Sequence, residues 1–179
     1  MHYLLYEIRL LCFGKITFKK SIFFMFYSKN YDKKSLDFME TALQEAIEAG
    51  KRNSIPVGAV IVKSNKIISS AGNEVKKAHD STAHAEILAI RRACSILKTP
   101  ILEDCDMYVT LEPCAMCAQA ISLARIRRLY FGAYDVKYGA VTHGCRVFEH
   151  ALHKTEIISG IFETQCKKIL VDFFKTKRY

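Results

Sequence analysis

Apolar residues recur at helical spacing from Ser35 onward. Between Leu36 and Ile47 they stand three or four positions apart, which places them on one face of a helix. Gly50 stands where such a helix could end. The pattern therefore predicts an amphipathic helix as the first element of the fold.

Two short apolar runs follow this helix. Residues 57–62 come directly after Pro56, and residues 67–68 follow the polar pair Ser64 and Asn65. Short apolar runs on either side of a tight polar turn are typical of a β-hairpin. We expect two neighbouring strands here.

The rest of the chain alternates between helical and strand patterns. Helices are expected over residues 87–97, after Pro113 and over residues 162–173, and strands over residues 107–111, 129–131 and 155–159. Helices that alternate with strands behind an opening hairpin indicate an α/β layered domain with a mixed sheet. A length of 179 residues is consistent with one such domain.

The positive charge is concentrated near the N-terminus. Lys and Arg number 27 against 18 acidic residues, which gives a formal net charge of +9. The first 34 residues hold seven basic and two acidic side chains, so they supply more than half of the excess. A basic balance favours polyanionic partners, although it does not identify one.

Residues 1–34 are predicted to be an N-terminal extension outside the fold, and residues 35–179 to be the folded domain. The longest uncharged stretch of the apolar extension, residues 21–28, is far shorter than the roughly 20 residues that span a membrane. No stable membrane insertion is therefore expected. We interpret the extension as the result of a mis-called upstream start codon. Met25 and Met39 are the internal alternatives for the start. An interfacial anchor and a targeting peptide are the competing interpretations.

The cysteines indicate a reducing compartment. Their number, seven, is odd, and the sequence has no recognisable secretory signal. Reduced thiols in a cytoplasmic protein fit this better than a disulfide framework does.

Two short motifs hold the candidate chemistry. His-Ala-Glu at residues 84–86 opens one predicted helix, and Pro-Cys-Ala-Met-Cys at residues 113–117 opens the next, with Pro113 in its first turn. Cys114 and Cys117 would lie one turn apart on the same helix face, where the helix N-terminus favours thiolate. Two thiolates and the His84 imidazole suit zinc and leave a fourth position for water, as in catalytic zinc sites. Glu86 could move protons beside that water.

Each motif taken alone has a second interpretation. A Cys-x-x-Cys pair can be a redox pair, but that leaves His84 and Glu86 without a role. It can also be half of a zinc finger, with His143 and Cys145 as the other pair. These two residues lie in a Gly-containing stretch typical of a loop, which disfavours that arrangement.

Three stretches resemble the tRNA-specific adenosine deaminases of the cytidine/deoxycytidylate deaminase superfamily. They are Ile-Pro-Val-Gly-Ala-Val at residues 55–60, His-Asp-Ser-Thr-Ala-His-Ala-Glu at residues 79–86 and Thr-Leu-Glu-Pro-Cys-Ala-Met-Cys at residues 110–117. The similarity runs from about Leu36 to the C-terminus. Ser81 departs from the family, which often has Pro there, but no ligand is lost.

The resemblance implies a three-layer α/β/α cytidine-deaminase-like fold with a mixed central sheet. It also implies one zinc ion per subunit, bound by His84, Cys114 and Cys117, with Glu86 as proton shuttle. The implied reaction is hydrolytic deamination of adenosine to inosine at the wobble position of an arginine tRNA anticodon. The family is generally homodimeric.

Substrate-binding candidates follow from the same resemblance. Asn73 and Asp135 match positions that contact the nucleic acid, and the ending Phe-Phe-x-x-basic offers Phe174, Lys175, Lys177 and Arg178 to bases and phosphates. Alternatively, this ending is an amphipathic helix with core phenylalanines and a solvated basic end.

Two alternative functions remain open at this point. Deaminases of free guanine, cytosine or cytidine share the fold and the zinc motif. A non-catalytic RNA-binding member of the fold is a further alternative, which the presence of Glu86 disfavours.

Overall fold

The computed structural model describes residues 31–177. Most of the predicted N-terminal extension, and Arg178 among the predicted RNA-contacting residues, therefore lie outside the described residues. Within residues 31–177, no helix is both long and apolar enough to cross a membrane.

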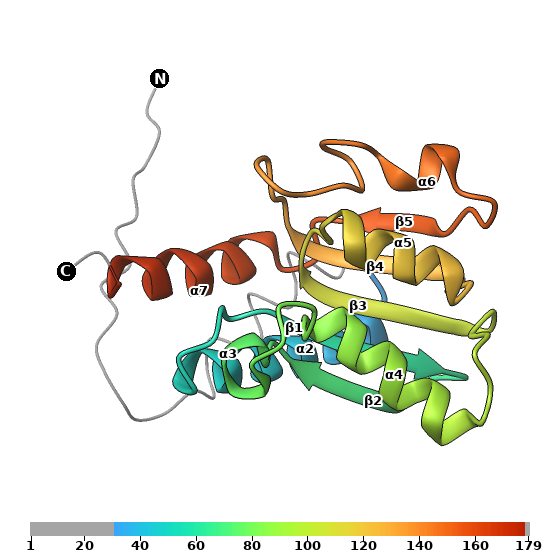
Figure 1. Ribbon diagram of the computed structural model, residues 1–179, viewed down its shortest axis with the longest axis horizontal. Coiled ribbons are helices and arrows are strands. Elements are labelled where there is room, and N and C mark those ends of the chain that lie inside the picture. Colours follow the sequence, from blue (N-terminus) through green and yellow to red (C-terminus); the bar gives the residue numbers. More distant parts are fainter. Residues whose placement is uncertain (1–30, 178–179) are drawn as a thin grey trace. The chain divides into compact units, whose positions relative to one another are not determined.

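A five-stranded mixed sheet forms the centre of the fold (Figure 1). Its order is β2-β1-β3-β4-β5, with β1 antiparallel to both β2 and β3, and with β3, β4 and β5 parallel to one another. The strands are β1 (Gly58–Lys63), β2 (Lys66–Gly72), β3 (Cys105–Leu111), β4 (Arg128–Ala133) and β5 (Glu156–Ser159). This confirms the predicted mixed sheet and its opening hairpin.

Helices cover both faces of the sheet. The helices α4 (Ala85–Leu97) and α5 (Ala115–Leu123) lie on one face, and α2 (Lys33–Lys51) and α7 (Glu163–Lys175) pack on the other. The short helices α3 (Val75–Ala78) and α6 (Val147–His150) lie in the connections. The three-layer α/β/α arrangement is therefore also confirmed.

Side chains alternate along each strand and pack toward the helices on both faces of the sheet. Ile61 and Met107 belong to the core cluster that includes Ala89 of α4. Tyr108, the neighbour of Met107 in β3, instead contacts Phe38 of α2, with the ring centroids 5.4 Å apart. Successive residues of a strand point to opposite faces, so each buried strand supplies both layers.

The helix α2 differs from its predicted limits at both ends. It begins at Lys33 because Asp32 caps it: the Ser35 backbone N–H donates to Asp32 Oδ1 at 2.8 Å. It continues past Gly50 to Lys51. The Tyr31 hydroxyl also donates to the Ser159 carbonyl at 2.7 Å, so the fold includes residues that precede Ser35.

Gly58 allows α2 to lie directly against β1. A Cβ at this position would collide with the carbonyl oxygen of Ala42 and with the backbone nitrogen of Ala46. Small residues on both elements therefore bring the helix close to the strand that leads out of the candidate site.

Candidate active site

Three ligand-type atoms meet at the N-termini of α4 and α5. His84 Nδ1 lies 3.8 Å from Cys114 Sγ and 3.5 Å from Cys117 Sγ, and the three ligand atoms lie within 4.8 Å of one another. Nitrogen and sulfur ligands of one tetrahedral zinc ion are expected about 3.6 Å apart, given the usual Zn–N and Zn–S bond lengths. The geometry of this cluster and its donor types therefore fit one zinc ion.

Local helix starts explain why these side chains converge. His84 is the N-cap of α4 and Cys114 the N-cap of α5, and neither side chain makes a capping hydrogen bond. Cys117 is the third residue of α5 and is buried. Pro113 precedes the cap and is not in the first turn as predicted, because Cys114 has an extended backbone with φ −72° and ψ 172°.

Contacts among the three side chains of the cluster shift their pKa values. Hydrogen bonds from Cys117 and His84 lower the pKa of Cys114 to about 4. The hydrogen bond to Cys114 and burial raise the pKa of Cys117. The hydrogen bond to Cys114 also raises the pKa of His84. Two adjacent thiolates repel each other, and a bound cation would relieve that repulsion.

Glu86 lies beside the cluster on α4. Its side chain is buried, and this burial raises the pKa of its carboxyl group above the ordinary value. A raised pKa favours the protonated form, so this carboxyl group can hold a proton between accepting it and returning it. Its environment therefore suits a proton carrier.

A cavity of about 280 Å3 opens over these groups. His84, Glu86 and Cys114 line it, and it lies where β3 ends and α4 and α5 begin. Ligands of open α/β sheets usually bind at the carboxyl ends of the strands. Its apolar walls include Ile55, Val57 and Leu111, none of which was singled out from the sequence as a site residue.

Two of the predicted substrate-binding residues line the same cavity. The Oδ1 atom of Asn73 accepts a hydrogen bond from the Val75 backbone N–H at 3.1 Å, which orients the amide. The Oδ1 atom of Asp135 accepts from the backbone N–H groups of Lys137 and Tyr138, each at 3.0 Å. The structure therefore brings Asn73 and Asp135 together with Glu86.

The C-terminal candidates lie elsewhere. Phe174 and Lys175 end α7, Lys177 follows it, and none of the three lines the cavity. The alternative interpretation of this ending as a helix with core phenylalanines is wrong for Phe174, whose exposed fraction is 45%. Its ring packs edge to face against Phe173, with centroids 5.4 Å apart.

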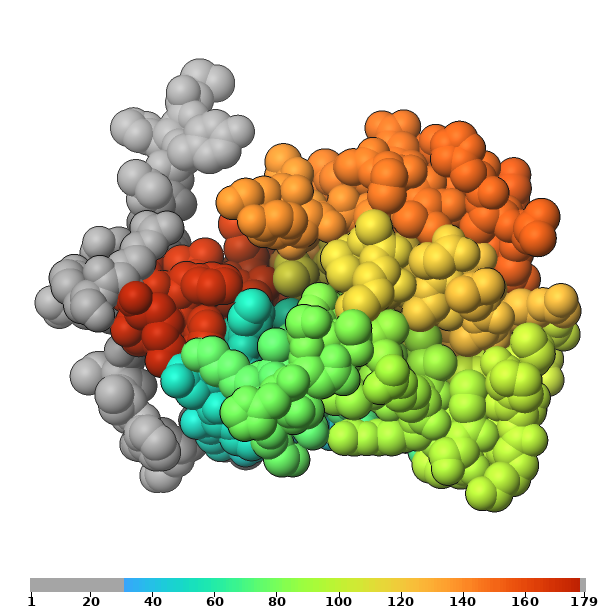
Figure 2. Space-filling model, viewed as in Figure 1, coloured from blue at the N-terminus to red at the C-terminus, as the bar shows by residue number. Residues whose placement is uncertain are grey.

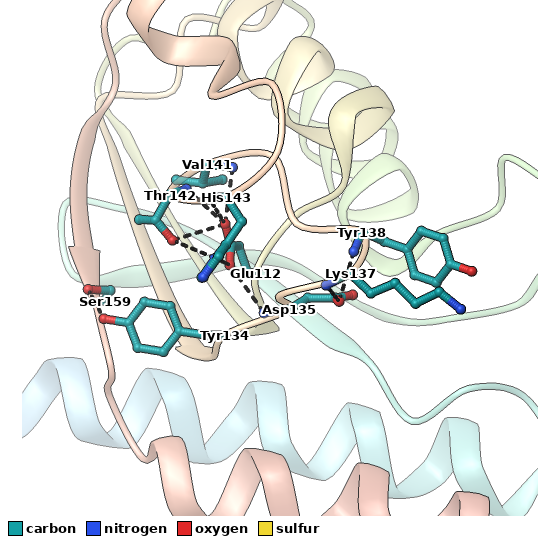
Figure 3. A network of polar contacts seen from close by, with 9 residues as sticks. All are labelled: Glu112, Tyr134, Asp135, Lys137, Tyr138, Val141, Thr142, His143 and Ser159. Atoms are coloured by element: carbon teal, nitrogen blue, oxygen red, sulfur yellow. Dashed lines mark hydrogen bonds and ion pairs between the residues drawn. The ribbon is translucent and has the colours of Figure 1, made fainter.

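Glu112 organises the loop that forms one side of the cavity (Figure 3). Its Oε1 accepts from the backbone N–H groups of Val141, Thr142 and His143 at 3.2, 2.8 and 3.0 Å. Its Oε2 accepts from the Asp135 backbone N–H at 3.1 Å and lies 2.7 Å from His143 Nδ1. One buried carboxylate therefore holds both ends of residues 135–143.

The protonation of Glu112 reflects these contacts. Burial raises the pKa of its carboxyl group, but the hydrogen bonds from Thr142, His143 and Asp135 together lower it below the ordinary value. Sequence reasoning did not identify this role. The available signal was an acidic residue at the end of a buried strand, since such a group needs partners.

His143 and Cys145 do not form the second ligand pair of a zinc finger. His143 Nδ1 faces Glu112, and Cys145 is exposed. Among residues 31–177, the group of His, Cys, Asp and Glu side chains able to hold a metal ion is His84, Cys114 and Cys117.

Comparison with known proteins agrees with this geometry. Residues 32–133 match the cytidine and deoxycytidylate deaminase zinc-binding region. The chain belongs to this deaminase family. The deaminase is 50% identical over 143 residues to a tRNA-specific adenosine deaminase of Agrobacterium fabrum, covering 79% of this chain and 94% of the relative.

Solved structures extend the comparison. One neighbour, from work on A-to-I editing by tRNA:A34 deaminases at the wobble position of transfer RNA, has a TM-score of 0.74 and 50% identity. The match covers 75% of this deaminase and 99% of that chain. A guanine deaminase from Bacillus subtilis has a TM-score of 0.55 and 39% identity, covering 58% of this deaminase and 66% of that chain. The fold is therefore shared with relatives that are named for different substrates.

Proposed function

We propose that this deaminase hydrolyses adenosine to inosine at the wobble position of a tRNA anticodon, and that the tRNA is an arginine tRNA. The observation that carries the proposal is the cavity, in which buried Glu86 and two ligands of the cluster lie together with Asn73 and Asp135. The choice of tRNA as substrate is supported by relatives that match over most of both chains.

The chain's residues would divide the chemistry between metal binding and proton transfer. His84, Cys114 and Cys117 would hold one zinc ion. When bound, this ion would lower the pKa of the attacking water. Glu86 would accept a proton from the attacking water and deliver protons to the ring nitrogen and to the departing amine. Water adds at C6 of adenine and ammonia leaves, so adenosine and water become inosine and ammonia.

The walls of the cavity would select and hold the base. Val57 and Leu111 offer apolar contact to the purine, while Asn73 and Asp135 place polar groups at its edge. A base reaches such a cavity only after leaving its stack, which costs least in a single-stranded loop. An anticodon loop meets that requirement.

We also propose that the deaminase is a homodimer in the cytoplasm. The helices α4 and α5 lie against each other on one face of the molecule (Figure 2). They expose the apolar side chains of Ile96, Met116 and Leu123. Exposed apolar groups of this kind favour association with another protein surface.

The substrate is tested by comparing an anticodon stem-loop with free guanine, adenosine and cytidine. Wobble-position inosine should form in the stem-loop, and the free compounds should release ammonia poorly, because they lack the flanking nucleotides. Stem-loops from other tRNAs test the choice of an arginine tRNA. Faster turnover of free guanine would instead support a guanine deaminase, which the 39% identity to such an enzyme makes the second candidate.

Residues 1–30 are expected to be dispensable for deamination. A shortened chain that begins at Tyr31 keeps the Asp32 cap and the hydrogen bond from Tyr31 to Ser159, so its kcat/KM on the stem-loop should match that of the full chain. A chain that begins at Ser35 loses both contacts. Its free energy of unfolding should fall by about 0.5–2 kcal/mol for the lost cap alone.

Denaturant unfolding and stem-loop deamination measure these two effects separately. A tenfold or greater loss of kcat/KM in a folded chain beginning at Tyr31 would show that the extension takes part in binding tRNA. The expectation that residues 1–30 are dispensable would then be wrong.

The basic ending is expected to strengthen RNA binding through phosphate contacts. Changing Lys175, Lys177 and Arg178 together to Ala should weaken binding and flatten its salt dependence by about 0.7–0.9 in log–log slope per lost contact. Zinc content should stay constant. A matched variant with Lys66, Lys98 and Lys154 changed to Ala alters net charge equally. Equal salt slopes for the wild type and the C-terminal variant would identify the ending as a solvated helix end.

A further inference from the structure

Tyr138 is placed unusually for an aromatic residue. It lines the cavity, yet its exposed fraction is 65%. An aromatic side chain usually contributes to stability by burying its ring. A ring that stays exposed at a cavity rim is instead available to a ligand.

The backbone beneath Tyr138 is fixed before any ligand binds. Its N–H donates to Asp135 Oδ1 at 3.0 Å, and the following Gly139 N–H donates to the Asp135 carbonyl at 2.9 Å. Glu112 accepts from the Asp135 N–H and approaches Gly139 so closely that a Cβ there would collide with its carboxylate. A preorganised backbone lowers the conformational entropy that the loop loses when a ligand stacks on the ring.

A positive charge lies over one face of the Tyr138 ring. Lys137 Nζ is 4.9 Å from the centroid of the Tyr138 ring, and the Lys137 side chain is exposed (Figure 3). An aromatic face next to an ammonium group matches the two parts of a nucleotide, since the base stacks and the phosphate is anionic.

We propose that Tyr138 stacks on the base of a nucleotide adjoining the target adenosine, and that Lys137 contacts the phosphate of that nucleotide. The inference rests on the proposed function. A cavity of about 280 Å3 is at the lower end of small-ligand pockets and accommodates one base, so a neighbouring nucleotide must lie at its rim. Tyr138 is the side chain of residues 135–143 that both lines the cavity and exposes an aromatic ring.

The ring is tested with three substitutions at position 138. In Tyr138→Ala and Tyr138→Leu, kcat/KM on the stem-loop should fall about 5- to 150-fold, the range of one lost base–aromatic stack. The loss should lie mainly in KM, because the reacting groups are unchanged. Tyr138→Phe should restore most of the activity, since it keeps the ring.

An altered RNA identifies the contact. Stem-loops with an abasic site on the 5′ or on the 3′ side of the wobble adenosine remove one neighbouring base each. With the correct neighbour missing, the wild type and Tyr138→Ala should have equal kcat/KM. If the Ala variant stays impaired by the same factor on both abasic RNAs, Tyr138 acts on the target base or on the fold, and the proposal is wrong.

A matched variant distinguishes the Tyr138 ring from the loop that carries it. Val136 is 79% exposed on the same loop and does not line the cavity, so Val136→Ala should behave as the wild type. A change of molecular mass in solution in Tyr138→Ala would place Tyr138 at an interface between copies and overturn the proposal. If wild-type protein leaves the stem-loop unmodified, the proposed function itself fails. If the wild type modifies the stem-loop and Tyr138→Ala and Tyr138→Leu are as active as the wild type, this inference alone fails.

Discussion

Replacing Glu86 with Gln is expected to leave the deaminase folded and able to bind zinc, and to reduce kcat on the anticodon stem-loop by at least about 10²–10⁴-fold. Gln has nearly the shape of Glu and fits the same buried position, but it cannot accept a proton. Since Glu86 serves several proton transfers in the proposed mechanism, the loss should reach or exceed the upper end of this range.

Three measurements check this expectation. Zinc content and the thermal unfolding midpoint should match those of the wild type, while single-turnover deamination should become slow. Glu103→Gln is a matched control, because Glu103 is exposed and pairs with Arg125 at 2.8 Å rather than lining the cavity. A Glu86→Gln variant with near-normal turnover would exclude Glu86 as the proton carrier.

Cys117→Ala is expected to abolish stoichiometric zinc binding and with it the deamination. Cys117 Sγ is buried 3.5 Å from His84 Nδ1, and its loss leaves two ligand side chains. Zinc that binds only the folded chain stabilises that chain, so the variant should also unfold at a lower temperature. A chelator should lower the unfolding temperature of the wild type and have little effect on the variant.

Elemental analysis of protein purified without added metal measures the zinc directly. Cys145→Ala provides the control, because Cys145 is exposed and lies outside the three-residue cluster. One zinc per chain in Cys117→Ala would contradict the assigned ligand set. Full activity in metal-free wild type would contradict the requirement for zinc.

Most of the secondary structure was predictable because its cause is local. The periodicity of apolar residues identified the helices and strands, and the Ser64-Asn65 pair forms the predicted turn, with φ of 49° and 60°. Helix ends were less predictable. Asp32 and Cys114 act as N-caps, and caps depend on backbone conformation that apolar periodicity does not encode.

The metal cluster was predictable because its residue types and spacing are typical of zinc ligands, and Asn73 and Asp135 were predicted from the family resemblance. His84 and the two cysteines formed a recognisable motif, and the structure places their ligand atoms together. Glu112 was missed because its partners lie 23 to 31 positions away in the chain, where no spacing rule applies. The separation of the α7 ending from the cavity depends on tertiary packing in the same way.

The hydrogen bonds of Glu112 have a consequence for how readily the loop can diverge. Most of its partners are main-chain N–H groups, which every residue except proline provides. The conformation of residues 135–143 is thus largely independent of the side chains at 136–138. Those side chains can be exchanged, by mutation over time or by a protein engineer, without dismantling the metal cluster, whose Cys114 and Cys117 follow Glu112 closely in the chain. Chemistry and sequence preference can therefore change separately in this scaffold.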